Sequence, residues 1–209
     1  MTITALKKKG SDVLIFLDDG TFLNLDYRIV LDYGLRKADH LDEKKIDLLK
    51  EKNSFLKARD SALRILARRR HSSYELKTKL FKKNYSKEVI GSVIQNLNEF
   101  SYLNDEEFAS AYISERIKQR KIGTNRLKAE LFKKGIDSKI AVKVLNETDK
   151  TELNENAYEI AKKKLKILKN KESDARKISS KLFAFLLSKG YEADLIKTIL
   201  NNLKIEFEE

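Results

Sequence analysis

Apolar residues recur at a helical spacing in two stretches of the chain that nearly repeat each other. Leu76 and Leu80 lie four positions apart, as do Leu127 and Leu131, and Phe-Lys-Lys follows each pair. A weaker third copy begins at Leu182. This spacing predicts one amphipathic helix in each copy. Because a single short module cannot bury its own apolar face, the repetition indicates that one small helical module was copied and stacked.

A helix stop and a helix start follow each copy at matching positions. The apolar face ends at a residue that can adopt a left-handed backbone conformation, namely Asn84, Gly135 or Gly190. Ser86 and Asp137 then supply N-caps for helices whose apolar positions coincide after a shift of 51 residues, and the third copy follows after a further 55. With one more helix before each copy, every module is predicted to contain three helices.

The repeats divide the chain into four predicted segments. An N-terminal extension covers residues 1–58, and the three modules cover 59–103, 104–150 and 151–209. The first helices of the first two modules are expected at 61–70 and 106–121. Ser72-Ser-Tyr-Glu75 matches a capping box, which predicts that the next helix begins near Ser73.

The N-terminal extension is rich in strand-forming residues. Two apolar runs, 13–17 and 21–25, flank Asp18-Asp19-Gly20, which predicts a β-hairpin, and residues 2–7 could add a third strand. A short helix is expected at 26–33, ended by Gly34, and a longer one at 41–56. Either the longer helix connects the sheet to the repeats, or the extension packs on the first repeat as an appendage.

Composition narrows the class of protein. Among 209 residues, 41% are apolar and 36% charged, which is typical of a globular but highly solvated chain. The absence of proline fits a mostly helical fold, because proline breaks helices. The absence of cysteine excludes disulfides and thiolate metal sites and fits a reducing cytoplasm. The N-terminus lacks the charge order of a secretory signal, and no apolar run approaches the ~20 residues that span a bilayer. We therefore expect a cytoplasmic protein that does not enter the membrane.

Residues suited to catalysis or metal binding are sparse. His40 and His71 are too few and too isolated for a metal cluster, and no glycine-rich loop precedes Lys-Ser or Lys-Thr. Asn104-Asp105-Glu106-Glu107 could hold a divalent cation, but acidic residues at a helix start also interact favourably with its partial positive charge. We prefer the capping interpretation, and we expect no enzyme activity, no metal and no cofactor.

Basic residues are concentrated in the first two modules. Of the formal net charge of +12, residues 1–58 carry +1, 59–150 carry +9 and 151–209 carry +2. Basic helix ends that recur on stacked modules could follow a phosphate backbone or an extended polymer, although a merely solvated face would carry the same residues. The candidate binding residues are Arg64, Arg68, Arg69, Arg70, Lys82, Lys83, Arg116, Arg120, Lys121, Arg126, Lys133 and Lys134.

Aromatic residues of the first two modules lie at helical spacing or beside helix ends. Core packing is the usual reason for such positions, and stacking on nucleobases would require that some of the rings be exposed. We therefore predict a core position for Phe81, Phe132, Tyr85, Tyr102, Phe108 and Tyr112.

Several motifs occur in an order that resembles one family. They are Arg68-Arg-Arg-His-Ser72-Ser-Tyr-Glu75-Leu76, then Tyr102-Leu-Asn-Asp105-Glu-Glu-Phe108-Ala109, then Arg116, Gly123 and Glu130-Leu131-Phe-Lys-Lys-Gly135-Ile136. Together, over about residues 59–204, they resemble the RecX family of regulatory proteins. Asn84 stands where the family often has glycine, and Asn104-Asp105 stands where an Asp-Asp pair is common.

The resemblance implies a fold and a function. The fold would be mainly α, with three tandem three-helix repeats in an elongated, curved array after a small N-terminal sheet. The function would be that of a non-enzymatic regulator, which binds the RecA recombinase filament on DNA and inhibits its ATP hydrolysis and strand exchange or promotes its disassembly. The expected partners are this filament and single- or double-stranded DNA, the DNA being bound weakly on its own, and we expect a monomer.

A second function is motivated by the same charge. The chain would then be a helical DNA- or RNA-binding module that acts without a recombinase.

Overall fold

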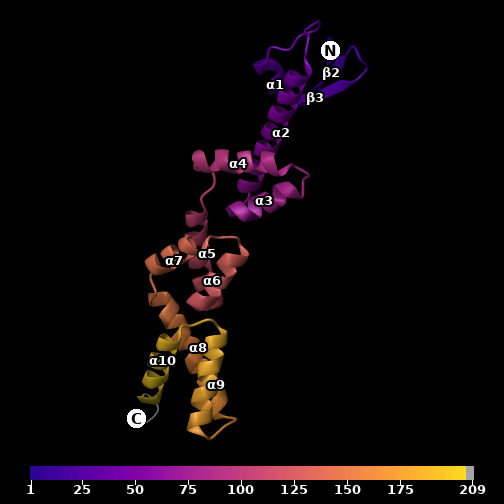
Figure 1. The fold of residues 1–209 in the computed structure, drawn as a ribbon. Helices are drawn as coiled ribbons and strands as arrows, with labels where there is room; N and C mark the ends of the chain where they lie inside the picture. The colour runs from indigo at the N-terminus through magenta and orange to yellow at the C-terminus, as the bar shows by residue number, and fades with distance from the viewer. Residues whose placement is uncertain (206–209) are drawn as a thin grey trace. The chain divides into compact units, whose positions relative to one another are not determined.

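The computed structural model describes residues 1–205, apart from the side chains of Arg120, Lys204 and Ile205. The chain forms two compact units: the first contains Met1–His71 and Glu75–Leu103, and the second contains Ser72–Tyr74 and the chain from Asn104 onward. Most described residues are helical, and one small sheet lies near the N-terminus (Figure 1). The predicted class, mainly α with a small N-terminal sheet, is confirmed.

The sheet of the first unit has three antiparallel strands in the order β1-β2-β3, which are Ile3–Lys9, Asp12–Leu17 and Phe22–Asp26. The predicted hairpin joins β2 to β3, and Gly20 adopts a positive φ of 83° in its turn. Alternate residues of β2, among them Ile15, are buried against α1 (Tyr27–Asp32) and α2 (Glu43–Leu66). Gly34, with a φ of 59°, follows α1 as expected.

Helix α2 corrects one prediction. The helices expected at 41–56 and 61–70 form a single helix, Glu43–Leu66. No glycine or proline interrupts residues 57–60, and the small side chains of Ala58 and Ala62 continue the buried face. The helix ends at Leu66, so Arg68 does not extend its surface as predicted.

Side-chain hydrogen bonds attach the sheet to α2. The amide of Asn53 accepts from the N–H of Asp26 at 2.7 Å and donates to the carbonyl of Asn24 at 3.1 Å. Lys57 forms an ion pair with Asp12 at 2.7 Å. Helix α2 thus contributes to two cores, one with the sheet and one with α3 (Ser73–Phe81) and α4 (Lys87–Glu99). It therefore connects the sheet to the first module.

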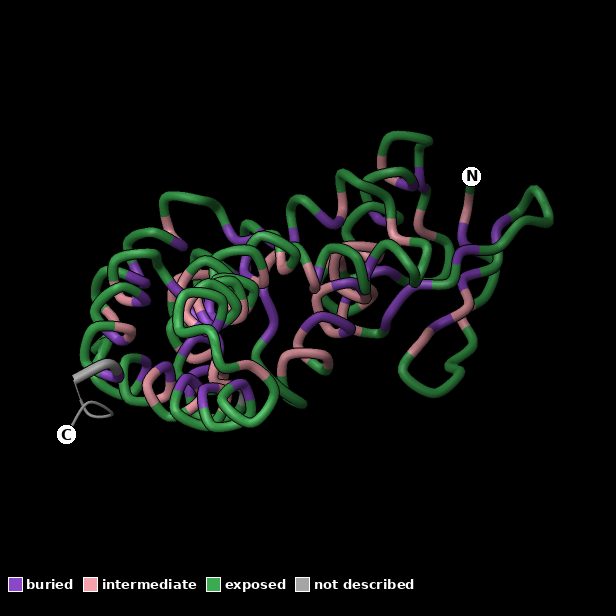
Figure 2. Tube along the Cα trace, turned by 90° about the horizontal axis from the view of Figure 1, so that it is seen from below, coloured by how far each residue is buried: buried purple, intermediate pink, exposed green. Residues whose placement is uncertain are grey.

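One continuous core runs through the second unit. Its helices are α5 (Asp105–Arg120), α6 (Thr124–Lys133), α7 (Ser138–Glu147), α8 (Thr151–Lys169), α9 (Ala175–Ser188) and α10 (Ala193–Ile205). Buried positions recur along one side of these helices (Figure 2), and Leu127 and Leu131 are fully buried, as the repeat pattern predicts. The three predicted stops are also confirmed, because Asn84, Gly135 and Gly190 have positive φ values of 62°, 72° and 88°.

Gly190 brings the turn between α9 and α10 against the start of α6. The N–H of Gly123 donates to the carbonyl of Lys189 at 3.0 Å, and the N–H of Asn125 donates to the carbonyl of Gly190 at 3.0 Å. A Cβ atom on Gly123 would lie 2.3 Å from the carbonyl carbon of Gly190. Only glycine at position 123 permits this approach of the two backbones.

Gly135, in the turn between α6 and α7, makes a corresponding contact with Ser72–Tyr74 inside the same unit. The Ser72 hydroxyl donates to the carbonyl of Lys134 at 2.6 Å, and a Cβ atom on Gly135 would lie 2.2 Å from Cβ of Tyr74. In both turns the residue just before the glycine supplies the acceptor. We call these two contacts, at Gly135 and at Gly190, the glycine joints.

Candidate functional site

The acidic stretch at the start of α5 serves to cap helices. The Asn104 side chain accepts from the N–H groups of Glu106 and Glu107 at 3.0 and 3.1 Å, and the Asp105 carboxylate accepts from the N–H of Ser73 at 2.7 Å. The capping interpretation is therefore confirmed. Residues 1–205 contain no group of three or more His, Asp or Glu side chains placed to hold a metal ion. In the same range, no helix is both long enough and apolar enough to cross a membrane.

The candidate basic residues differ in exposure. Eight are exposed: Arg64, Arg68, Arg69, Arg70, Lys82 and Lys83 in the first unit, and Arg126 and Lys133 in the second. Arg116, Lys121 and Lys134 are half-buried, and the side chain of Arg120 lies outside the described residues. The sequence pattern therefore identified mostly accessible cations, but not which of them take part in the fold.

Arg116 belongs to a polar cluster between α5 and α6. Its Nε atom lies 3.1 Å from a carboxylate oxygen of Glu130, which also accepts from the Tyr112 hydroxyl at 2.8 Å. The guanidinium lies over the Tyr112 ring, 4.7 Å from its centroid. Burial of the Tyr112 hydroxyl, together with its bond to Glu130, raises the pKa of this tyrosine. The cluster gives Arg116 a structural role that the sequence did not reveal.

Three other candidates also make local contacts. Arg69 pairs with Glu75 at 3.0 Å within the first unit. Lys121 ends α5 in a left-handed conformation, with a φ of 46°. Lys134 supplies the carbonyl of one glycine joint, and its ammonium group lies 6.0 Å from the Tyr112 ring centroid. A change of the Lys134 side chain would therefore remove a contact with Tyr112 as well as a surface charge.

The core prediction for aromatic residues is wrong for three of the six. Phe81, Phe132 and Tyr102 are 60%, 77% and 57% exposed, whereas Phe108 is buried and Tyr85 and Tyr112 are half-buried. Each exposed phenylalanine directly follows a fully buried leucine of the same helix. Consecutive helical residues point about 100° apart, so the leucine occupies the core and the phenylalanine faces solvent.

A groove of about 390 Å³ opens between α6 and α7 in the second unit. Ala129, Phe132, Ile136 and Ala141 give it an apolar lining, and lysines also line it. Sequence reasoning missed this groove, because a groove depends on how two helices pack. The available signal was the spacing of Ala129 and Phe132, which places them on one face of α6.

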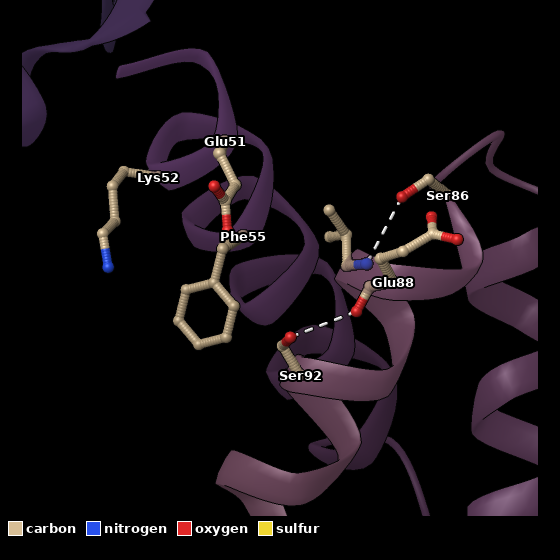
Figure 3. A pocket seen from close by; sticks show the side chains of 7 residues that line it. Glu51, Lys52, Phe55, Ser86, Glu88 and Ser92 are labelled. Atoms are coloured by element: carbon tan, nitrogen blue, oxygen red, sulfur yellow. Dashed lines mark hydrogen bonds between the residues drawn. The ribbon is translucent and has the colours of Figure 1, made fainter. Parts of the chain in front are cut away.

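A second groove, of about 320 Å³, lies between α2 and α4 in the first unit (Figure 3). Glu51, Lys52, Glu88 and the Phe55 ring line it. Two serine hydroxyls in its lining already make hydrogen bonds within the α4 region, because Ser86 accepts from Val89 and Ser92 donates to the carbonyl of Glu88 (Figure 3). Because both acidic and basic side chains line this groove, its charge does not favour one class of ligand.

Of the two histidines, the structure buries His71. It is 3% exposed, its Nδ1 atom lies 2.8 Å from the carbonyl of Arg69, and its Nε2 atom is buried without a hydrogen-bond partner. Burial disfavours the charged imidazolium and so lowers the pKa of His71 below its ordinary value of 6.5.

We expect this histidine to make stability depend on pH. Below pH 6.5 the unfolded chain binds a proton that the folded chain does not, so the free energy of unfolding should fall by up to about 1.4 kcal/mol per pH unit until the lowered pKa is reached. Urea unfolding between pH 7.5 and 5.5 measures this slope. His71→Gln should flatten it and the exposed control His40→Gln should not; equal slopes in all three proteins would contradict the prediction.

Family models match the three helical modules that follow the N-terminal extension. Three consecutive family models match: the first three-helix domain of RecX at residues 58–97, the second at 104–145 and the third at 151–200. The chain belongs to the RecX family. The three matches follow the order of the modules inferred from the repeats.

Curated relatives extend this similarity over nearly the full length. A protein named "Regulatory protein RecX" from Clostridium perfringens (strain 13 / Type A) is 34% identical, and the alignment covers 97% of this chain and 94% of the relative. A protein of the same name from Clostridium botulinum (strain Alaska E43 / Type E3) is 31% identical, and the alignment covers 96% of this chain and 94% of the relative. Alignments of 202 residues include most of the N-terminal extension as well as the RecX domains.

Solved RecX structures share the fold. A crystal structure of regulatory protein RecX matches with a TM-score of 0.79 and 21% identity over 96% of this chain and 98% of that chain. RecX from Lactobacillus salivarius matches with a TM-score of 0.69 and 25% identity over 74% of this chain and 99% of that chain. This chain therefore consists of a small N-terminal sheet followed by three helical RecX domains.

Proposed function

We propose that this chain is a non-enzymatic regulator that binds the RecA filament on DNA. It would inhibit ATP hydrolysis and strand exchange by RecA or promote disassembly of the filament, acting as a monomer in the cytoplasm. The observation that carries the proposal is membership of the RecX family over nearly the whole length, with relatives named as regulatory proteins. No catalytic group is needed, because a ligand that prefers one state of a filament shifts the population towards that state.

The exposed cations support this proposal. Lys82 and Lys83 follow the final turn of α3, and Lys133 ends α6 at the equivalent place in the second module. A filament presents the same surface repeatedly, so tandem modules joined in one chain can engage it with a high effective concentration. We assign filament or DNA contact to the exposed candidates, and structural roles to Arg116, Lys121 and Lys134.

The test follows ATP hydrolysis by RecA filaments assembled on single-stranded DNA. Addition of the chain at less than one copy per ten RecA protomers should lower the rate by well over a tenth, because each bound chain affects many protomers. Filament length, measured in parallel by electron microscopy, separates inhibition from disassembly. Unchanged hydrolysis even at an excess of the chain would exclude the proposed function.

The alternative function makes a different prediction. A module that acts on nucleic acid alone should bind naked DNA or RNA tightly, with log affinity falling linearly and steeply with log salt concentration. The net charge of +12 is the observation that favours it. Weak binding to naked DNA together with tight binding to the filament would exclude this alternative.

A further inference from the structure

Each module leaves an apolar side chain exposed at the same position. Phe81, Phe132 and Leu187 are 60%, 77% and 49% exposed, and each directly follows a buried leucine in the second helix of its module. Scattered exposed apolar residues are common, but recurrence at one repeat position is not explained by the fold, because the preceding leucine already fills the core. A repeated surface role explains it.

The second module shows what such a residue can do. Phe132 borders the groove between α6 and α7, where Ala129, Ile136 and Ala141 provide further apolar surface. Lys128 and Lys133 line the same groove and place positive charge beside this apolar surface. The groove thus combines a site for an apolar side chain with charges that attract carboxylates.

We propose that this groove binds an acidic segment of a partner protein. One apolar side chain of the segment would pack against Phe132 and Ala129, and its carboxylates would lie near Lys128 and Lys133. This inference rests on the proposed function, because the partner is the protein of the filament rather than its DNA. Phe81 and Leu187 offer the corresponding apolar contact in the other two modules, so repeated filament protomers could use repeated contacts.

The chemistry of the groove favours protein over nucleic acid. A nucleobase carries several hydrogen-bonding groups around its edge, and these lose free energy when they are buried without partners. Polar side chains in the lining are limited to those of Asn125, Ser138 and the two lysines, and the apolar residues Ala129, Ile136 and Ala141 offer no partner for these groups. An aliphatic or aromatic side chain has no such groups, so the apolar lining suits it better.

The first test compares Phe132→Ala with two controls that remove exposed apolar side chains elsewhere. These are Phe100→Ala, at a phenylalanine that is 63% exposed, and Val142→Ala, at a valine of α7 that is 41% exposed and does not line the groove. Affinity for RecA filaments and for naked single-stranded DNA is measured for each full-length variant. Phe132→Ala should bind the filament about 10- to 30-fold more weakly with unchanged DNA affinity, whereas both controls should bind as the unaltered chain does.

The second test identifies what occupies the groove. The chain has no cysteine, so Ala129→Cys provides a single thiol for a photoactivatable cross-linker, and Val142→Cys is the matched control. On the filament, the probe at position 129 should capture RecA and the probe at 142 should capture much less. Mass spectrometry of the adduct should locate an acidic RecA segment.

The outcomes separate the two proposals. If the unaltered chain binds filaments but Phe132→Ala binds equally well, the groove has no such role and the proposed function stands. If Phe132→Ala loses filament and DNA affinity equally, or the probe captures DNA, the occupant is nucleic acid and the inference is overturned. If the unaltered chain does not bind filaments at all, both proposals fail.

Discussion

Gly190→Ala is expected to destabilise the second unit by about 2 to 5 kcal/mol. Position 190 has a φ of 88°, which costs a residue with a Cβ atom about 1 to 2 kcal/mol. The new Cβ would also lie 2.6 Å from the backbone nitrogen of Arg126, and forced shifts of this kind add about 1 to 3 kcal/mol. The glycine joint at Gly190 should therefore open.

Hydrogen exchange measures this opening locally. In the intact joint the amides of Gly123 and Asn125 donate to the carbonyls of Lys189 and Gly190, so both should exchange much faster in Gly190→Ala. Gly34→Ala is the matched control, because Gly34 has a φ of 59° but a Cβ atom added there would meet no atom within 4 Å. It should show only the smaller backbone cost, and equal destabilisation by both variants would show that close packing at Gly190 is unimportant.

Reversal of three exposed lysines is expected to weaken filament binding by at least about 100-fold. The variant combines Lys82→Glu, Lys83→Glu and Lys133→Glu, and it lowers the formal net charge from +12 to +6. At each position, repulsion between the new carboxylate and the negative charges of the filament would replace the attraction of the lysine. The slope of log affinity against log salt concentration should also fall. Lys134 is left unchanged, because it is half-buried and its ammonium group lies near the Tyr112 ring. Filament binding and ATP hydrolysis at several salt concentrations provide the measurement.

The control for this variant carries the same change in net charge elsewhere. Lys7, Lys8 and Lys9 are exposed on β1, outside the three RecX domains, and their reversal to glutamate also lowers the net charge to +6. It should weaken binding far less. Equal loss in both variants would mean that total charge decides affinity, and full binding by the first variant would assign its lysines to a solvated face.

The sequence correctly predicted those parts of the fold that depend on residues adjacent in the chain. The hairpin around Gly20 and the stops at Asn84, Gly135 and Gly190 follow from backbone preferences of single residues, and the structure has them all. The sequence pattern did not predict that α2 is one uninterrupted helix. Ala58 and Ala62 are fully buried, but their small side chains give only a weak apolar signal in the sequence.

The candidate site was less predictable because it depends on contacts between distant residues. Basic residues were correctly expected at the surface in most cases, but the pairing of Arg116 with Glu130 requires α5 to pack beside α6. Leu131 and Phe132 are consecutive residues that point in different directions from α6. The sequence of this pair alone does not say which of the two side chains faces the core and which faces solvent. The groove beside it requires the packing of α7 as well.

The glycine joints tolerate side-chain changes at the residues that accept their hydrogen bonds. Their acceptors at positions 134 and 189 are main-chain carbonyls, which are present whatever side chain a mutation introduces. Glycine at positions 123, 135 and 190, together with the Ser72 hydroxyl, is what these contacts require of the side chains. The third copy shares few side chains with the first two, and yet its second helix ends in the same kind of turn, with a positive φ at Gly190.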